Sequence, residues 1–211
     1  MRLILVRHGE TPYNTQHRIT GQTDVPLNPL GQQQAELVGA YLARDTIDVI
    51  VSSDLQRTRV TASAIARTHD LPVEEDADLR EIAMGVWEGL TGQEITARFP
   101  DSRVRWSDDP KHYAIPDGGE TITQVQERVA RAVERWQTRY PDATVVWTTH
   151  GGLIGITVCH LLNLDISRRW QFRHENASIT EFFLAPGRVI LTRLNETAHL
   201  ANISHVEGAE A

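Results

Sequence analysis

Apolar residues follow two alternating patterns along the chain. Continuous or β-branched apolar runs predict buried strands at about residues 2–7, 47–51 and 144–149. Apolar residues three or four positions apart predict helices over residues 31–44, from 55 to 69, from 122 to just before Pro141, and over 151–162. Strands that alternate with helices in this way indicate an α/β layered fold with a largely parallel sheet.

Local signals mark where several of these elements begin. Thr91 is followed by Glu94 and Thr121 by Gln124, and both pairs have the capping-box spacing of a helix N-terminus. Further along, two apolar runs within residues 178–194 flank a Pro-Gly turn and predict a β-hairpin.

The 211 residues fit one domain of generous size. We expect a single domain over residues 1–200, built as a three-layer α/β/α sandwich with a mostly parallel central sheet. Residues 11–29 read as a polar, turn-rich loop, and residues 85–120, rich in Trp, Pro, Asp and Gly, as a lid-like insertion over the site. Residues 201–211 form a polar tail that is expected to fray.

The composition indicates the cellular compartment of the protein and the kinds of partner it can bind. The net charge of −7 argues against a nucleic acid or an anionic membrane as partner. A single cysteine, Cys159, excludes an intrachain disulfide and favours a reducing compartment. The N-terminal apolar run is too short for a signal peptide or a membrane span. A cytoplasmic protein is therefore expected.

Charged and imidazole side chains follow all three predicted strands. Arg7 and His8 follow the first strand, Arg57 the second and His150 the third. Because the carboxyl ends of parallel strands meet at one edge of a sheet, these side chains are expected to converge. Helix N-termini expected at residues 9, 55 and 151 would add amide donors for an anion. Two histidines among several anion donors indicate phosphate chemistry on a nitrogen nucleophile.

The same residues belong to a longer series of motifs. They are Leu5-Val-Arg-His-Gly-Glu-Thr11, Asn14, Thr20-Gly21, Ser52-Ser-Asp-Leu-Gln-Arg57, Leu79-Arg-Glu81 with Gly85-Val-Trp-Glu-Gly89, Gly118-Gly-Glu120 and Thr149-His-Gly151. In this order they resemble the histidine phosphatase superfamily, in its phosphoglycerate-mutase-like branch, over roughly residues 2–200. Several further segments are most similar to the metal-independent phosphoserine phosphatases.

The resemblance implies a role for each matching residue. His8 corresponds to the nucleophile that becomes phosphohistidine, and Glu81 to the proton donor for the leaving group. Phosphate oxygens are expected to be clamped by Arg7, Arg57 and His150, with further substrate contacts from Asn14, Thr20, Gly21 and Gly151. No metal and no cofactor are implied, because fixed cations take the place of a metal ion.

Each assignment has a rival within the chain. Arg59 lies two residues from Arg57 and is an alternative clamp, although the motif favours Arg57. The alternatives to Glu81 as the acid are Glu75, Glu88 and Glu94. Trp87 and Trp106 in the lid-like insertion are candidates for the wall of a substrate pocket.

The activity expected from this resemblance is hydrolysis of small phosphomonoesters through phosphohistidine, with phosphoserine or phosphoglycerate-type acids as candidate substrates. The segment between Glu81 and His150 is shorter than in the similar mutases, which favours hydrolysis over phosphoryl transfer between hydroxyls. Met84 stands where phosphoserine-selective members tend to have His, so the substrate stays open. Alternatives are a cofactor-dependent phosphoglycerate mutase, a glucosyl-3-phosphoglycerate or α-ribazole phosphatase, and a non-catalytic phospholigand binder. A homodimer is expected by analogy alone.

Overall fold

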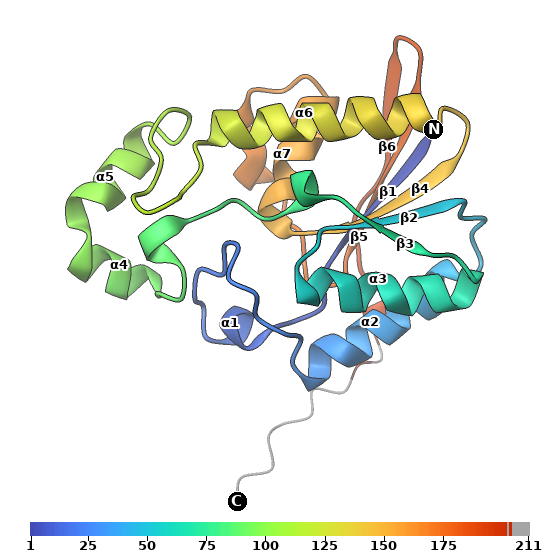
Figure 1. The fold of residues 1–211 in the computed structure, drawn as a ribbon, viewed down its shortest axis with the longest axis horizontal. Coiled ribbons are helices and arrows are strands. Elements are labelled where there is room, and N and C mark those ends of the chain that lie inside the picture. Colours follow the sequence, from blue (N-terminus) through green and yellow to red (C-terminus); the bar gives the residue numbers. More distant parts are fainter. Residues whose placement is uncertain (202, 204–211) are drawn as a thin grey trace, which may run out of the picture.

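A computed structural model of the protein describes residues 1–201 and 203 and contains one six-stranded sheet (Figure 1). The strands are β1 (Arg2–Arg7), β2 (Val49–Ser52), β3 (Val73–Glu75), β4 (Thr144–Thr149), β5 (Ile179–Ala185) and β6 (Arg188–Glu196). Their order is β3-β2-β4-β1-β5-β6. The first four are parallel, whereas β5 pairs antiparallel with β1 and β6 with β5. The prediction of a mostly parallel sheet is confirmed.

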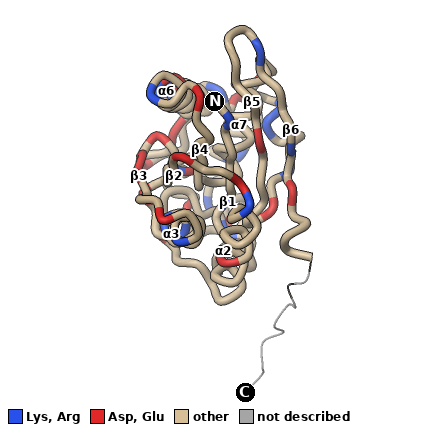
Figure 2. Tube along the Cα trace, turned by 90° about the vertical axis from the view of Figure 1, so that its right-hand side faces the viewer, with Lys and Arg blue, Asp and Glu red and all other residues tan. Residues whose placement is uncertain are grey.

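Helices cover both faces of this sheet. On one face lie α2 (Pro29–Leu42) and α3 (Gln56–His69), and on the other α6 (Ile122–Arg139) and α7 (Gly151–Leu161). In β1, Ile4 packs in the core cluster that contains residues of α2 and α3, whereas Leu3 packs in the cluster of α6 and α7. Such alternation is what a strand buried on both faces requires. The three-layer sandwich is confirmed, and Figure 2 shows α6 on one side of the strands and α2 and α3 on the other.

Both predicted capping boxes are present. At the start of α6, the Thr121 side chain accepts a hydrogen bond from the Gln124 amide at 3.1 Å, and the Gln124 side chain accepts one from the Thr121 amide at 2.9 Å. Trp136, near the other end of α6, donates from Nε1 to Asp76 Oδ2 at 2.7 Å. This last contact holds α6 beside the carboxyl end of β3, which ends at Glu75.

Some elements were not predicted. The predicted loop over residues 11–29 contains a one-turn helix, α1 (Pro12–Thr15), and no helix begins at residue 9, so that expectation was wrong. The short edge strand β3 was also missed. Short 3₁₀ helices are η1 (Ala77–Leu79), η2 (Gly85–Trp87), η3 (Ile166–Gln171) and η4 (Ala198–Leu200).

The segment predicted as a lid-like insertion contains α4 (Gly92–Arg98) and the unpredicted α5 (Pro100–Asp108). These two helices lie beside the sandwich, at the left of Figure 1. At the other end of the chain, the predicted tail falls outside the described residues except for 201 and 203. None of the helices in the described part of the chain combines the length and the apolarity needed to cross a membrane.

Candidate active site

A cavity of about 490 Å³ opens at the carboxyl ends of β1, β2 and β4. It is reached by the loops and helices that follow these strands, as expected for the edge of a parallel sheet. Eight of the nine residues predicted for the site line this cavity, namely Arg7, His8, Asn14, Thr20, Gly21, Arg57, Glu81 and Gly151. The chain therefore brings together groups that are more than 140 residues apart in sequence, at Arg7 and Gly151.

His8 directly follows β1 and is only 3% exposed. Its Nδ1 lies 2.7 Å from the carbonyl oxygen of Gly9, and because a carbonyl only accepts, Nδ1 carries the ring proton. Burial first, and then the charges of Arg57 and Arg7, lower the pKa of His8 well below 6.5. The ring is thus neutral at pH 7, with an unprotonated Nε2, which is the form that can act as a nucleophile.

His150 is the predicted residue that does not line the cavity. It is fully buried behind His8, with the two ring centroids 5.2 Å apart and the rings at 61°. Its Nδ1 accepts from Nε of Arg57 at 3.3 Å, so its Nε2 carries the proton and donates to Ser53 Oγ at 3.0 Å. Burial is also the largest cause that lowers the pKa of His150 well below 6.5. His150 therefore supports both His8 and Arg57 from the core side.

Two arginines flank the imidazole of His8. Arg7 donates from Nη1 to the carbonyl oxygen of His174 at 2.7 Å, while its buried Nε has no partner among the described residues. Arg57 donates to the carbonyl oxygens of Thr23 and Gly21, both at 2.8 Å. Burial lowers the pKa of Arg57 to about 10, which leaves it charged at pH 7. Neither guanidinium forms an ion pair within the described residues, so both are available to bind an anion in the cavity.

The side-chain amide of Asn14 is oriented by its neighbours. Its Oδ1 accepts from the amide and the hydroxyl of Thr11, at 3.0 and 2.9 Å, and from Nδ2 of Asn176 at 3.2 Å. Because the oxygen is used by three donors, Nδ2 of Asn14 is the atom left to donate at the cavity wall.

Glu81 is the one carboxylate in the cavity lining, and two backbone amides hold it. Its Oε1 accepts from the Ile82 amide at 3.0 Å, and its Oε2 accepts from the Gly152 amide at 3.1 Å, in the first turn of α7. The approach is close, since a Cβ atom at Gly152 would lie 2.5 Å from Glu81 Oε1. Glu81 is therefore fixed against the helix that follows His150.

The rival residues are engaged elsewhere. Arg59 is exposed and pairs with Glu75 at 3.5 Å, outside the cavity. Glu88 accepts from the backbone amides of Gln22, Thr23 and Met84. Glu94 completes the capping box of α4 and pairs with Arg18.

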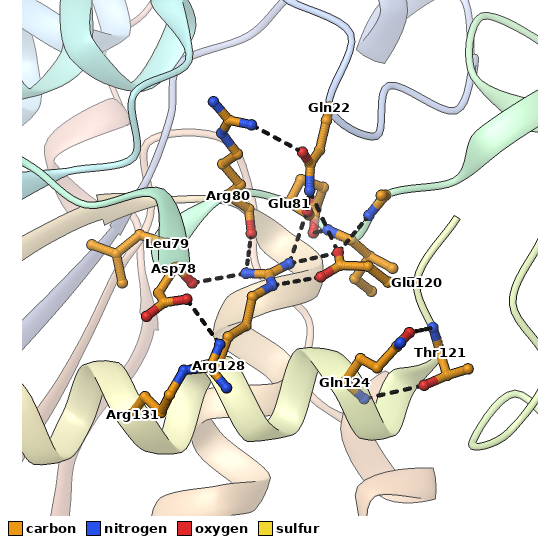
Figure 3. A network of polar contacts seen from close by, with 12 residues as sticks. Gln22, Asp78, Leu79, Arg80, Glu81, Glu120, Thr121, Gln124, Arg128 and Arg131 are labelled. Carbon is orange, nitrogen blue, oxygen red and sulfur yellow. Dashed lines mark hydrogen bonds and ion pairs between the residues drawn. The ribbon is translucent and has the colours of Figure 1, made fainter. Parts of the chain in front are cut away.

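The segment that carries Glu81 is tied to α6 by Arg128, which is 6% exposed (Figure 3). Its guanidinium donates to the carbonyl oxygens of Asp78, Arg80 and Glu81, at 2.8, 2.6 and 2.9 Å. It also pairs with both carboxylate oxygens of Glu120, at 2.9 and 3.0 Å. Sequence analysis did not single out Arg128, because nothing in the sequence shows that a helix residue contacts these carbonyls.

The cavity wall contains further residues that are not part of the predicted site. Met84 and Trp106 line it as the sequence suggested, whereas Trp87 is buried and packs edge-on against Trp106 at 6.1 Å. The lining residues that are not among the predicted site residues are Arg18, Ile19, Ile82, Gly152, Arg169, Trp170, Phe172, Arg173 and His174. Five of these lie within η3 or in the three residues that follow it, a segment that contains no catalytic motif.

Comparison with known proteins fits this geometry. The sequence model of the histidine phosphatase superfamily (branch 1) matches residues 3–197. The chain belongs to this superfamily.

Several relatives of this histidine phosphatase are named as phosphatases. Phosphoserine phosphatase 1 of Hydrogenobacter thermophilus is 35% identical over 211 residues, which cover 100% of this chain and 99% of the relative. Glucosyl-3-phosphoglycerate phosphatase of Mycolicibacterium vanbaalenii is 38% identical over 78% of this chain and 76% of its own length. A crystal structure of a mutant phosphoserine phosphatase from Entamoeba histolytica with phosphoserine has a TM-score of 0.83 at 31% identity, covering 94% of this chain and 98% of that one. This histidine phosphatase is a phosphoric monoester hydrolase that acts on small phosphorylated metabolites.

Proposed function

We propose that the protein hydrolyses phosphorylated small acids, with phosphoserine and phosphoglycerate-type acids as the first candidates, through a phosphohistidine at His8 and without a metal ion. The observation that carries this proposal is the neutral His8, with its unprotonated Nε2, between Arg7 and Arg57 at the cavity. The full-length relative named for phosphoserine supports the choice of substrate. The arginines supply the positive charge that a metal ion provides in other phosphoryl-transfer sites.

In the first step, His8 Nε2 attacks phosphorus and the ester P–O bond breaks. Arg7, Arg57 and the Nδ2 of Asn14 bind the equatorial oxygens, together with backbone groups at Thr20, Gly21 and Gly151. Glu81 gives its proton to the leaving alkoxide. His150 fixes the ring of His8 and the guanidinium of Arg57 through the contacts described above.

In the second step, a water molecule attacks the phosphohistidine. The Glu81 carboxylate takes a proton from this water, which regenerates the acid for the next cycle. The N–P bond breaks, the electron pair returns to His8 Nε2, and inorganic phosphate leaves. Glu81 therefore acts as a general acid in the first step and as a general base in the second.

Several properties of the whole protein are part of the proposal. The chain acts as a single domain over residues 1–200. Residues 85–120 cover the substrate in this domain, and the position of Trp106 in the cavity wall supports that role. The single cysteine, Cys159, is buried, which fits a reducing cytoplasm. A homodimer, and no nucleic-acid or membrane partner, complete the proposal.

The test is release of phosphate in the presence of excess chelator. The substrates are phosphoserine, 3-phosphoglycerate, glucosyl-3-phosphoglycerate, α-ribazole phosphate and p-nitrophenyl phosphate. The wild type is compared with His8→Ala and with His112→Ala, a control at an exposed histidine. We expect His8→Ala to abolish turnover and the acid-labile phosphoenzyme, and His112→Ala to change neither.

Each outcome has a defined meaning. Near-normal turnover by His8→Ala in chelator would overturn the phosphohistidine mechanism. A wild type that needs an added metal ion would overturn metal independence. Conversion of 3-phosphoglycerate into its positional isomer faster than phosphate release would replace hydrolysis by the mutase alternative.

A further inference from the structure

Positive charge in the cavity exceeds what a single phosphate group needs. Five arginines line it, with Glu81 as the one acidic group: Arg7, Arg18, Arg57, Arg169 and Arg173. Two of these are neutralised by acidic partners, Arg18 by Glu94 and Arg173 by Glu175. The proposed mechanism uses two more, Arg7 and Arg57. Arg169 remains without an assigned role.

Arg169 is a buried cation that lacks an anionic partner. It is 4% exposed and forms no ion pair within the described residues. Its Nη1 donates one long hydrogen bond, 3.3 Å, to the carbonyl oxygen of Ile166, and its Nε has no partner there. The ring of Trp170 lies against the guanidinium, 4.8 Å from Cζ, and is 68% exposed. A buried guanidinium without an acidic partner is energetically unfavourable unless it binds an anion.

Helix α7 relates Arg169 to the phosphate end of the cavity. A Cβ atom at Gly151 would lie 3.3 Å from Arg7 Nε, and one at Gly155 would lie 3.6 Å from the Cβ of Arg169. Gly151 and Gly155 are four residues apart on one helix face, a rise of about 6 Å. The backbone and Cβ of Arg169 thus lie against α7 one turn further along than the Arg7 guanidinium. Both arginines line the same cavity, so a ligand with its phosphate at Arg7 can extend along this wall toward Arg169.

We propose that Arg169, covered by Trp170, binds a carboxylate on the leaving group of the substrate and so selects phosphorylated acids over other phosphomonoesters. A guanidinium with free donors on one side offers the two-point geometry that a carboxylate accepts. One unpaired arginine matches the single charge of a carboxylate. This inference rests on the proposed phosphatase function and adds the residue that determines its substrate class.

The experiment compares two substrates that differ only at the far end. These are 3-phosphoglycerate and glycerol 3-phosphate, in which a hydroxymethyl group replaces the carboxylate. The variants are Arg169→Met and, as matched control, Arg168→Met, which removes an exposed arginine of η3 outside the cavity lining. Steady-state kcat and KM are measured for each pair, with p-nitrophenyl phosphate as a third substrate.

In the wild type we expect kcat/KM for 3-phosphoglycerate to exceed that for glycerol 3-phosphate at least tenfold. Arg169→Met should lower kcat/KM for 3-phosphoglycerate about 10- to 100-fold, mainly through KM, since one charge-assisted interaction is lost. The same variant should change the value for glycerol 3-phosphate less than about threefold, the factor expected when no contact is lost. Arg168→Met should leave both values unchanged.

Three results would overturn the assignment of Arg169: no preference in the wild type, an equal loss on both substrates, or the same loss in Arg168→Met. If Arg169→Met does not fold, Arg169→Gln keeps a donor for Ile166 and must show the same loss of preference. Failure of the wild type to hydrolyse any of the three substrates would instead count against the proposed function. Activity on p-nitrophenyl phosphate without discrimination between the other two would leave the phosphatase intact and remove only the role of Arg169.

Discussion

Removal of the Arg128 guanidinium is expected to loosen the segment that carries Glu81. In Arg128→Met the side chain keeps its apolar stem and loses every donor. Three carbonyl oxygens and the Glu120 carboxylate then lose their hydrogen bonds to Arg128, although the Glu81 carbonyl keeps Nε2 of Gln22 at 3.1 Å (Figure 3). Loss of one partner of a buried ion pair costs about 3–5 kcal/mol. The Glu120 side chain is 21% exposed and keeps the Ala83 amide at 2.9 Å, so the lower end applies.

A loss of about 3 kcal/mol corresponds to a decrease in Tm of about 6–12 °C for a chain of this size. Arg131→Met is the matched control, because Arg131 lies one turn further along α6 and forms an exposed ion pair with Asp78 at 3.1 Å. Exposed pairs contribute about 0–1 kcal/mol, so this control should lower Tm by at most a few degrees. Calorimetry of both variants measures the difference.

The catalytic effect of Arg128→Met should depend on the leaving group. Phosphoserine and 3-phosphoglycerate release alkoxides that need the proton of Glu81, whereas p-nitrophenolate leaves without one. We therefore expect kcat/KM, which reports formation of the phosphohistidine and not its hydrolysis, to fall on the first two substrates and much less on p-nitrophenyl phosphate, at a temperature where the variant is folded. An equal fall on all three would refute the view that Arg128 acts through Glu81. An unchanged Tm would refute the energetic reasoning.

Three further perturbations follow from the geometry of the site. Gly152→Ala should lower kcat about 100-fold by displacing Glu81, because Oε1 of Glu81 would lie 2.5 Å from the new Cβ atom. Gly92→Ala is the control and should have no effect, because its Cβ atom would meet nothing within 4 Å. Equal kcat values for the two variants would contradict this. Because the pKa of His8 is lowered, the acid limb of kcat/KM that belongs to His8 should lie below pH 6.5, and an NMR titration of the ring at or above 6.5 would disprove it. Burial lowers the pKa of His174 to about 4. Below pH 6.5 the unfolded chain therefore binds a proton at this residue that the folded chain does not bind. The free energy of unfolding should fall as the pH is lowered from 6.5 to 4. Urea unfolding at pH 7 and 5 should show a smaller decrease in His174→Asn than in the wild type.

The sequence was sufficient for the elements that have a strong pattern of their own. β1 and β4 are buried strands in the middle of the sheet, with continuous apolar or β-branched residues. Their predicted bounds agree with the observed ones. β3 has no such run, because Val73-Glu-Glu75 becomes a strand only through its pairing with β2. α5 was missed because it is short and largely polar, although Pro at its start and the buried Trp106 were usable signals.

The site shows the same division. His8, Arg57 and Glu81 could be predicted because they follow strands or belong to recognisable motifs. The roles of Arg128 and Arg169 depend instead on what lies near them in space. One arginine meets three carbonyl oxygens and a carboxylate, and the other meets no acid among the described residues. The spacing of residues along the chain does not predict the neighbours of either arginine.

The close contacts along α7 also limit how stable this protein can become. Glycine in a helix is about 1 kcal/mol less favourable than alanine, and α7 contains it at positions 151, 152 and 155. Elsewhere such positions are convenient targets for thermostabilisation. Here Gly151 and Gly152 leave room for the side chains of Arg7 and Glu81, and Gly155 leaves room for the backbone carbonyl of Arg169. Alanine at position 152 or 155 would therefore displace Glu81 or the backbone at Arg169. Substitutions that raise thermal stability without loss of turnover have to be sought on the other face of the sheet, in α2 and α3.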